Sequence, residues 1–173
     1  MSNSKINKLA YIGLLLALAL IFSYLEFLLP PFLPVPGFKL GLSQIPVLMA
    51  FYLFDFKSAL TVSLLKVVIF SLIVGYFFSF LFFVSLSGSL AALFFMYLFR
   101  KIGFSIYGVS VFSALGHNIG QFFVVYLLLG VNAVIPYIPF ILLFSVLTGL
   151  LIGIIVNYIK YYFDKKANKN IQS

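Results

Sequence analysis

The chain has no cysteine among its 173 residues, and only 8% of its residues are charged. Without cysteine it cannot form disulfides, thiolate metal sites or a cysteine nucleophile. Ordinary soluble domains carry about 25% charged residues, whereas 64% of this chain is hydrophobic. A soluble fold of this length would leave apolar side chains over its whole surface, but a bilayer surrounds such a surface with lipid tails. The composition therefore predicts an integral membrane protein.

Side chains that can act in catalysis or bind metals are scarce as well, because the chain has one histidine and three acidic residues. A closed metal site of three or four protein ligands is not expected from this set. The sequence also lacks a GxxxxGK[ST] phosphate loop, a GxSxG elbow and an HExxH motif. We therefore expect no enzyme activity, no catalytic residue, no bound metal and no cofactor. Energy for any active transport must come from an ion gradient or from another subunit.

The apolar sequence divides into six runs, which are separated by prolines, glycines and charged residues. Spanning a bilayer takes about 20 apolar residues per helix. The second run is short for a full span, so we expect it to be tilted or partly re-entrant. The prediction is one all-α transmembrane domain over residues 1–173, a six-helix bundle with an outer loop at 30–44 and a cytoplasmic tail at 159–173. The expected helices cover residues 9–29, 40–54, 58–74, 78–99, 105–129 and 136–158.

Basic residues are divided unevenly between the two ends of the predicted bundle. Six helices place both termini on one side of the membrane, and that side holds nine basic residues while the other holds only Lys39. Cytoplasmic loops are enriched in Lys and Arg, so we expect cytoplasmic termini in a bacterial plasma membrane. The same distribution accounts for the net charge of +8 without a nucleic-acid partner. The nine residues are Lys5, Lys8, Lys57, Arg100, Lys101, Lys160, Lys165, Lys166 and Lys169.

Charged residues inside apolar runs mark a candidate binding site. Lys66 lies nine residues from both Lys57 and Gly75, near mid-membrane, where a cation costs about 2.5–3.5 kcal/mol on insertion scales. It must reach water, an acceptor within the bundle or an anion, so a structural ion pair and contact with an anionic ligand both stay open. Glu26, near the outer end of the first helix, can pair with Lys39 or Lys66, or orient a group of a ligand. Lys39 belongs to the proline-rich outer loop, which is suited to act as a lid.

The fifth predicted helix carries a polar stripe. At 100° per residue, His117 and Gln121 share one face with Ser110 and Ser113, and Asn118 lies at the edge of that face. A lone buried histidine is often structural. The grouping of His117, Asn118 and Gln121 instead favours a hydrogen-bonding wall that lines a cavity.

Small residues recur four positions apart on several of the predicted helices. In lipid, helix association depends on close approach of the backbones, which small residues permit. Packing within the bundle and docking of a partner subunit both stay open as explanations. The pairs are Gly13/Ala17, Gly88/Ala92, Gly116/Gly120 and Gly149/Gly153.

Four segments carry a resemblance to a known family: Tyr24-Leu25-Glu26 followed by Pro30-Pro31, Gly37-Phe38-Lys39-Leu40-Gly41-Leu42, Leu65-Lys66, and Gly116-His117-Asn118-Ile119-Gly120-Gln121. The second and fourth are the most specific, because mixed glycine and polar residues are not generic in apolar runs. From about Leu9 to Asn157 the chain resembles the Gx transporter family, also called heptaprenyl diphosphate synthase component I. That family belongs with the substrate-binding (S) components of energy-coupling factor (ECF) transporters. It favours arginine where this chain has Lys66, so the positive charge is kept but bidentate contact with a phosphate or carboxylate is lost.

The resemblance implies an S component that binds a small solute in an outward-opening intramembrane pocket. It also implies a transmembrane coupling protein and two cytosolic ATPase subunits as partners, with Ala10, Gly13 and Ala17 meeting the coupling protein. The excess of lysine near the pocket favours an anionic solute, and the family label suggests an isoprenoid- or quinone-related one. The candidate substrate-binding residues are Glu26, Lys39, Lys66, His117, Asn118 and Gln121.

Two other function classes stay open. The family label suggests a membrane subunit associated with heptaprenyl diphosphate synthesis, but Asp55 and Asp164 are isolated and form no DDxxD motif for Mg²⁺–diphosphate. That role would therefore be accessory rather than catalytic. The other class is an anchoring subunit of a quinone- or flavin-linked redox complex.

Overall fold

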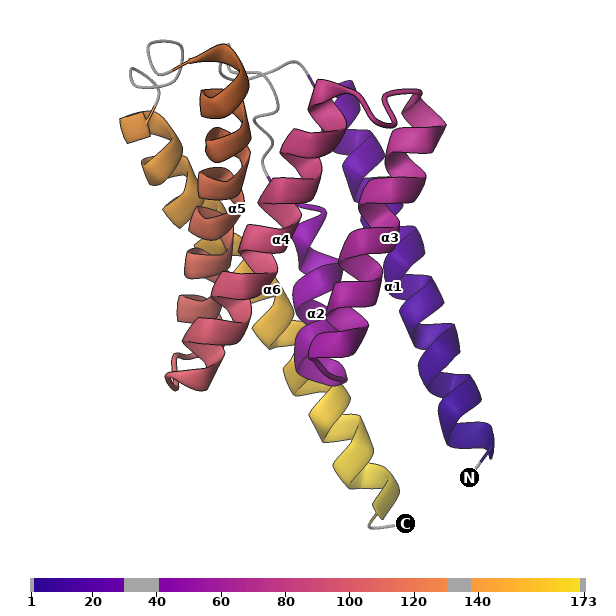
Figure 1. Cartoon of the computed structure of the whole chain (residues 1–173). Coiled ribbons are helices and arrows are strands. Elements are labelled where there is room, and N and C mark those ends of the chain that lie inside the picture. Colours follow the sequence, from indigo (N-terminus) through magenta and orange to yellow (C-terminus); the bar gives the residue numbers. More distant parts are fainter. Residues whose placement is uncertain (1, 30–40, 131–137, 172–173) are drawn as a thin grey trace.

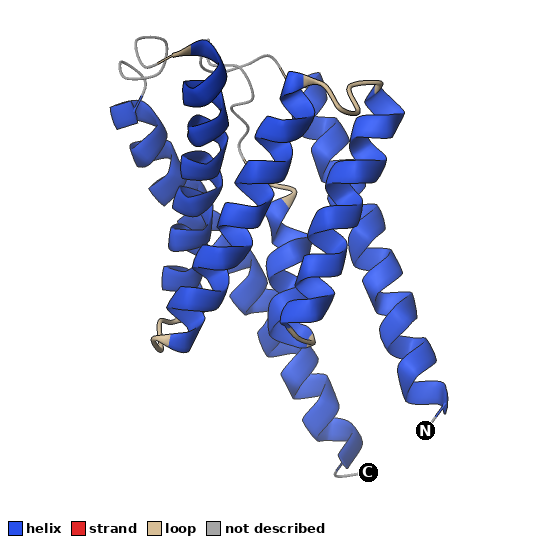
Figure 2. Cartoon of the chain, in the orientation of Figure 1, coloured by secondary structure: helices blue, strands red, loops and turns tan. Residues whose placement is uncertain are grey.

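The computed structural model describes residues 2–29, 41–130 and 138–171, and the regular elements within these ranges are all helices, joined by short turns (Figures 1 and 2). All of its helices except the second are long and apolar enough to cross a membrane. The predicted all-α, six-helix architecture is therefore confirmed. The helices are α1 (Ser2–Leu28), α2 (Gln44–Leu53), α3 (Phe56–Val74), α4 (Phe80–Lys101), α5 (Ile106–Leu129) and α6 (Ile138–Ile171).

The first and last helices extend beyond the limits that the sequence predicted. α1 begins at Ser2 rather than at residue 9, and α6 continues to Ile171 through the segment predicted as a tail. No glycine or proline interrupts residues 2–12 or 159–171, so the helical hydrogen bonds continue past the apolar runs. In α6, Lys160 and Asp164 also form an ion pair at 2.6 Å with i,i+4 spacing, which favours a helix.

α2 is a half-length helix enclosed by the others. Its ten residues rise about 15 Å, about half of the 30 Å hydrocarbon core. Eight of the ten are buried, as expected for a helix that is apolar on all sides. Figure 1 shows the chain entering α2 midway along the bundle and leaving it towards the end that carries the termini. The predicted short second helix is confirmed, although it begins at Gln44 rather than at residue 40.

The bundle consists of two groups of helices. α1, α2 and α3 pack on one another, and α5 packs on both α4 and α6. Contacts of α3 with α4 and of α2 with α6 join the two groups. The whole is therefore a bundle with a seam between α1–α3 and α4–α6.

Basic residues gather at the end of the bundle where both termini lie (Figure 1). Lys8 of α1 pairs there with Asp55, in the turn between α2 and α3, at 2.6 Å. Arg100, near the end of α4, lies over the ring of Tyr52 at 4.3 Å from the ring centroid. The helix ends that the sequence assigned to one side of the membrane thus meet at one end of the fold.

Glycines allow α5 to approach both of its neighbours closely. A Cβ atom on Gly120 would lie 2.5 Å from the carbonyl oxygen of Ser87 on α4. A Cβ atom on Gly149 of α6 would lie 2.6 Å from the Cα atom of Val111. By contrast, Gly13 on α1 is exposed and has nothing within 4 Å of such an atom. The small residues of α4, α5 and α6 therefore pack within the chain, whereas those of α1 face outwards.

Candidate functional site

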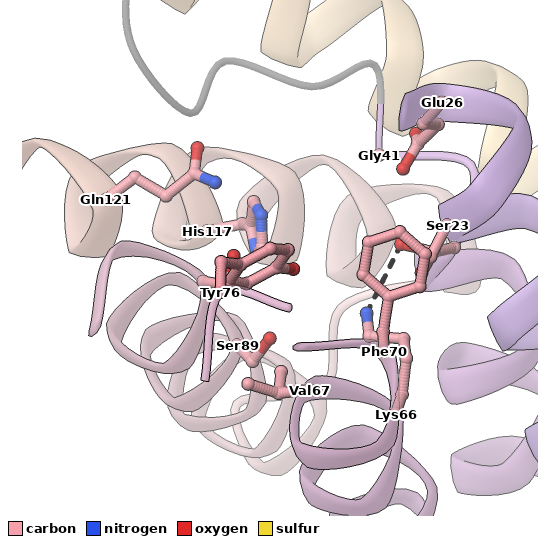
Figure 3. A pocket seen from close by; sticks show the side chains of 12 residues that line it. Ser23, Glu26, Gly41, Lys66, Val67, Phe70, Tyr76, Ser89, His117 and Gln121 are labelled. Carbon is pink, nitrogen blue, oxygen red and sulfur yellow. Dashed lines mark hydrogen bonds between the residues drawn. The ribbon is translucent and has the colours of Figure 1, made fainter. Parts of the chain in front are cut away.

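A polar cavity lies across the seam of the bundle. It is lined by side chains from α1, α3, α4 and α5 and by the segment that leads into α2 (Figure 3). Its volume is about 20 Å³, room for about one water molecule. The residues selected from the sequence that line it are Glu26, Lys66, His117 and Gln121.

Lys66 brings a positive charge to this cavity from α3. Its side chain is buried, with 4% of its surface exposed, and its Nζ donates a hydrogen bond to Ser43 Oγ at 3.3 Å. Ser43 immediately precedes α2, so the accepting hydroxyl group belongs to the residue that caps this helix inside the bundle. The ammonium group therefore faces the polar cavity and not the lipid.

Glu26 supports the non-helical segment that leads into α2. The carboxylate is buried near the end of α1 and accepts a hydrogen bond from the backbone N–H of Leu42. Non-helical backbone at membrane depth needs such partners, because lipid supplies none. Gly41, just before it, has a φ angle of +84°, which favours glycine. Glu26 thus holds the entry to α2 in place as well as lining the cavity.

His117 and Gln121 form the wall across the cavity from Lys66 and Glu26 (Figure 3). They lie one turn apart on α5, and both are buried. His117 Nδ1 lies 3.0 Å from the side-chain amide nitrogen of Gln44, at the start of α2. The imidazole is therefore fixed by a residue from the other helix group.

One of the predicted binding residues, Asn118, is described by the structure and lies away from the cavity. Asn118 is buried between α5 and α6, where its amide donates a hydrogen bond to Ser145 Oγ, and it does not line the cavity. Ser113, on the same predicted stripe, donates to the carbonyl oxygen of Ala92 at 3.3 Å. The stripe therefore serves both helix packing and the cavity. Lys39 lies outside the described residues.

Several polar residues that line the cavity were not predicted from the sequence. Ser23 lies one turn before Glu26 on α1, and Ser85 and Ser89 lie one turn apart on α4. Tyr76, in the turn between α3 and α4, completes the lining on the side away from the termini. Single serines are common in apolar helices and do not indicate a cavity. The spacing of one turn between Ser85 and Ser89 was the sequence feature that pointed to a polar face.

The cavity combines an ammonium, a carboxylate, an imidazole, a carboxamide and hydroxyl groups. Within the described ranges, no three His, Cys, Asp or Glu side chains come together as a metal site. The same groups are suited to bind a polar solute through several hydrogen bonds.

A second candidate surface is the exposed face of α1 that carries small residues. Ala10, Gly13 and Ala17 are all exposed, and their spacing of three and four residues places them along one face of the helix. This face presents little side-chain bulk to the surroundings, so another helix could approach its backbone closely.

The chain is similar in fold to a solved structure and in part of its sequence to a curated protein. A solved structure of the S component of a bacterial ECF transporter aligns with a TM-score of 0.68, covering 94% of this chain and 98% of that chain at 19% identity. The riboflavin transporter RibU of Streptococcus thermophilus is 43% identical over 67 residues, which are 38% of this chain. The chain thus matches only 29% of the length of that curated relative.

These findings and the long apolar helices identify a multi-pass protein of the cell membrane with the fold of an ECF S component. Residues 15–159 match the family model described as heptaprenyl diphosphate synthase component I. That match covers most of the chain and includes the cavity residues of α1, α3, α4 and α5. The chain belongs to the heptaprenyl diphosphate synthase component I family.

Proposed function

We propose that this chain is the substrate-binding subunit of an ECF-type importer, and that it binds a small anionic solute in the cavity between α1, α3, α4 and α5. The observation that carries the proposal is Lys66, a buried lysine midway along a membrane helix that lines a polar cavity. A cation at this depth is retained at a cost, which an anionic ligand offsets. The fold and the transport function named for its relatives support the same conclusion.

The solute enters this proposed site from outside the cell. Tyr76 and Glu26 line the cavity on the side away from the termini. Basic residues cluster at the terminal end, which favours the cytoplasm for that end. Since the cavity of about 20 Å³ holds about one water molecule, the solute-bound state must be wider than the state described here.

The binding site is tested by mass spectrometry of the small molecule that co-purifies with the protein in detergent. We expect Lys66→Met to lose this molecule, because the substitution keeps an unbranched side chain but removes the charge. The matched control is Lys57→Met, which removes an exposed lysine from the first turn of the same helix. We also expect His117→Ala to reduce the amount bound. Wild-type levels of the molecule in both cavity variants would rule out this site.

We further propose that the exposed face of α1 docks a transmembrane coupling protein, which joins the chain to two cytosolic ATPase subunits. Replacing Gly13 by leucine would fill this face without disturbing the bundle, since nothing lies within 4 Å of a Cβ atom there. We expect Gly13→Leu to lose co-purifying ATPases at an unchanged unfolding temperature. Thr61→Leu, at an exposed site on α3, is the control. Co-purification of a soluble prenyl synthase in place of the ATPases would favour the accessory role in isoprenoid synthesis.

A further inference from the structure

Gln44 contacts the candidate site but has no role in the function proposed above. It is the first residue of α2, and its side chain is 4% exposed. Its backbone N–H donates to the carbonyl oxygen of Gly41 at 2.9 Å, which fixes the start of the helix. From this anchored position its side-chain amide nitrogen reaches to 3.0 Å from His117 Nδ1.

This contact is compatible with one tautomer of the neutral imidazole when the amide nitrogen of Gln44 is the donor. The amide nitrogen of glutamine can donate a hydrogen bond but cannot accept one. His117 Nδ1, as its partner, is therefore the acceptor. In a neutral imidazole with an acceptor at Nδ1, the proton lies on Nε2. The ring of His117, which borders the cavity (Figure 3), is thereby a hydrogen-bond donor at Nε2.

Packing alone does not explain a glutamine at this position. Among the described residues, the side-chain oxygen of Gln44 is buried without a hydrogen-bond partner. A buried polar atom of this kind is unfavourable. Leucine or methionine would fill a similar space without that cost. What the amide contributes among the described residues is the hydrogen bond of its nitrogen with His117.

We infer that Gln44 is a positioning residue that holds His117 as the tautomer protonated on Nε2, so that this wall of the cavity selects a solute with an acceptor oxygen. The solute part of the inference rests on the proposed function. With the Lys66 ammonium on the opposite wall, the cavity presents hydrogen-bond donors from both helix groups. Carboxylate and phosphate oxygens are acceptors of the required chemistry.

The tautomer can be measured directly, because His117 is the only histidine in the chain. Protein labelled with ¹⁵N-histidine and purified without a histidine tag gives nitrogen NMR signals from this single ring. At neutral pH we expect a protonated Nε2 and an unprotonated Nδ1 in the wild type. Gln44→Leu should give a mixture of tautomers, and Gln44→Glu should move the proton towards Nδ1, because a carboxylate accepts.

Ser113→Ala is the matched control, since it removes another buried polar side chain one turn before His117 on α5. We expect the wild-type tautomer in this variant. Circular dichroism establishes that each variant is folded before its spectrum is compared. A wild-type ring protonated on Nδ1, or a Gln44→Leu spectrum identical to that of the wild type, would overturn the inference.

A second measurement separates this inference from the proposed function. The NMR result requires no solute, so it stands even if the chain is not a transport subunit. In the mass-spectrometric assay we expect Gln44→Leu to retain about tenfold less of the co-purifying molecule, as for one lost hydrogen bond. Wild-type retention in Gln44→Leu together with loss in Lys66→Met would overturn the role in selectivity alone. Wild-type retention in both variants would instead count against the proposed function.

Discussion

At the scale of single residues, Asp55 shows how one carboxylate links two helices. It accepts hydrogen bonds from Lys8 of α1 at 2.6 Å and from the backbone N–H of Ser58 in α3 at 2.7 Å. These bonds, the one from Lys8 first, lower the pKa of Asp55 from 3.8 to about 2. Because the pKa is lower in the folded state, the ionised carboxylate stabilises the fold above pH 3.8, and this contribution is lost as the pH falls through about 2.

We expect Asp55→Asn to lower the thermal unfolding midpoint at neutral pH, and the difference from wild type to vanish towards pH 2. Asparagine keeps an oxygen that can cap α3 but loses the charge. Because both partners are more than a third exposed, the effect should be at most about 1 kcal/mol. Circular dichroism in a nonionic detergent measures it. An undiminished difference at pH 2 would contradict this account, and Lys8→Met should add nothing to Asp55→Asn.

The candidate site was predictable where a polar side chain interrupts an apolar run. Lys66, His117 and Gln121 stood out for that reason, and all line the cavity. Asn118 was equally conspicuous, but its partner Ser145 lies on another helix, which the periodicity of α5 cannot reveal. Gln44 lay in a segment predicted as outer loop, so its contact with His117 required the fold.

At the scale of helices, sequence patterns located the apolar spans better than the helix ends. Hydropathy reports where side chains meet lipid, whereas helical hydrogen bonds continue until glycine or proline interrupts them. α1 and α6 therefore exceed their predicted bounds. The length of the second apolar run indicated a short helix, but its burial depends on α1, α3 and α6 around it.

The close packing of α4 against α5 leads to a prediction about the stability of the bundle. We expect Gly120→Ala to destabilise the protein by about 1–3 kcal/mol, because the added methyl group would lie 2.5 Å from the carbonyl oxygen of Ser87. Gly13→Ala is the matched control, with nothing within 4 Å of its Cβ atom. Thermal unfolding in detergent compares the two. Equal midpoints for the two variants would show that this helix contact tolerates extra volume.

At the scale of the whole molecule, the orientation in the membrane is open to direct measurement. The chain has no cysteine, so single cysteines report accessibility without background. We expect Phe77→Cys, in the turn between α3 and α4, to react with an impermeant maleimide in intact cells. Lys101→Cys, at the other end of α4, should react only after the cells are permeabilised. The reverse pattern would place the termini outside.

The cavity also lies where the two groups of helices, α1–α3 and α4–α6, meet. Glu26 and Lys66 belong to the α1–α3 group, and His117 and Gln121 to the α4–α6 group. One hydrophobic core runs through both groups of helices, so the cavity can gain volume only if contacts between the groups, such as those of α3 with α4, loosen. The hydrogen bond between Gln44 and His117 spans the two groups. Separation of the two groups at that depth would break this hydrogen bond.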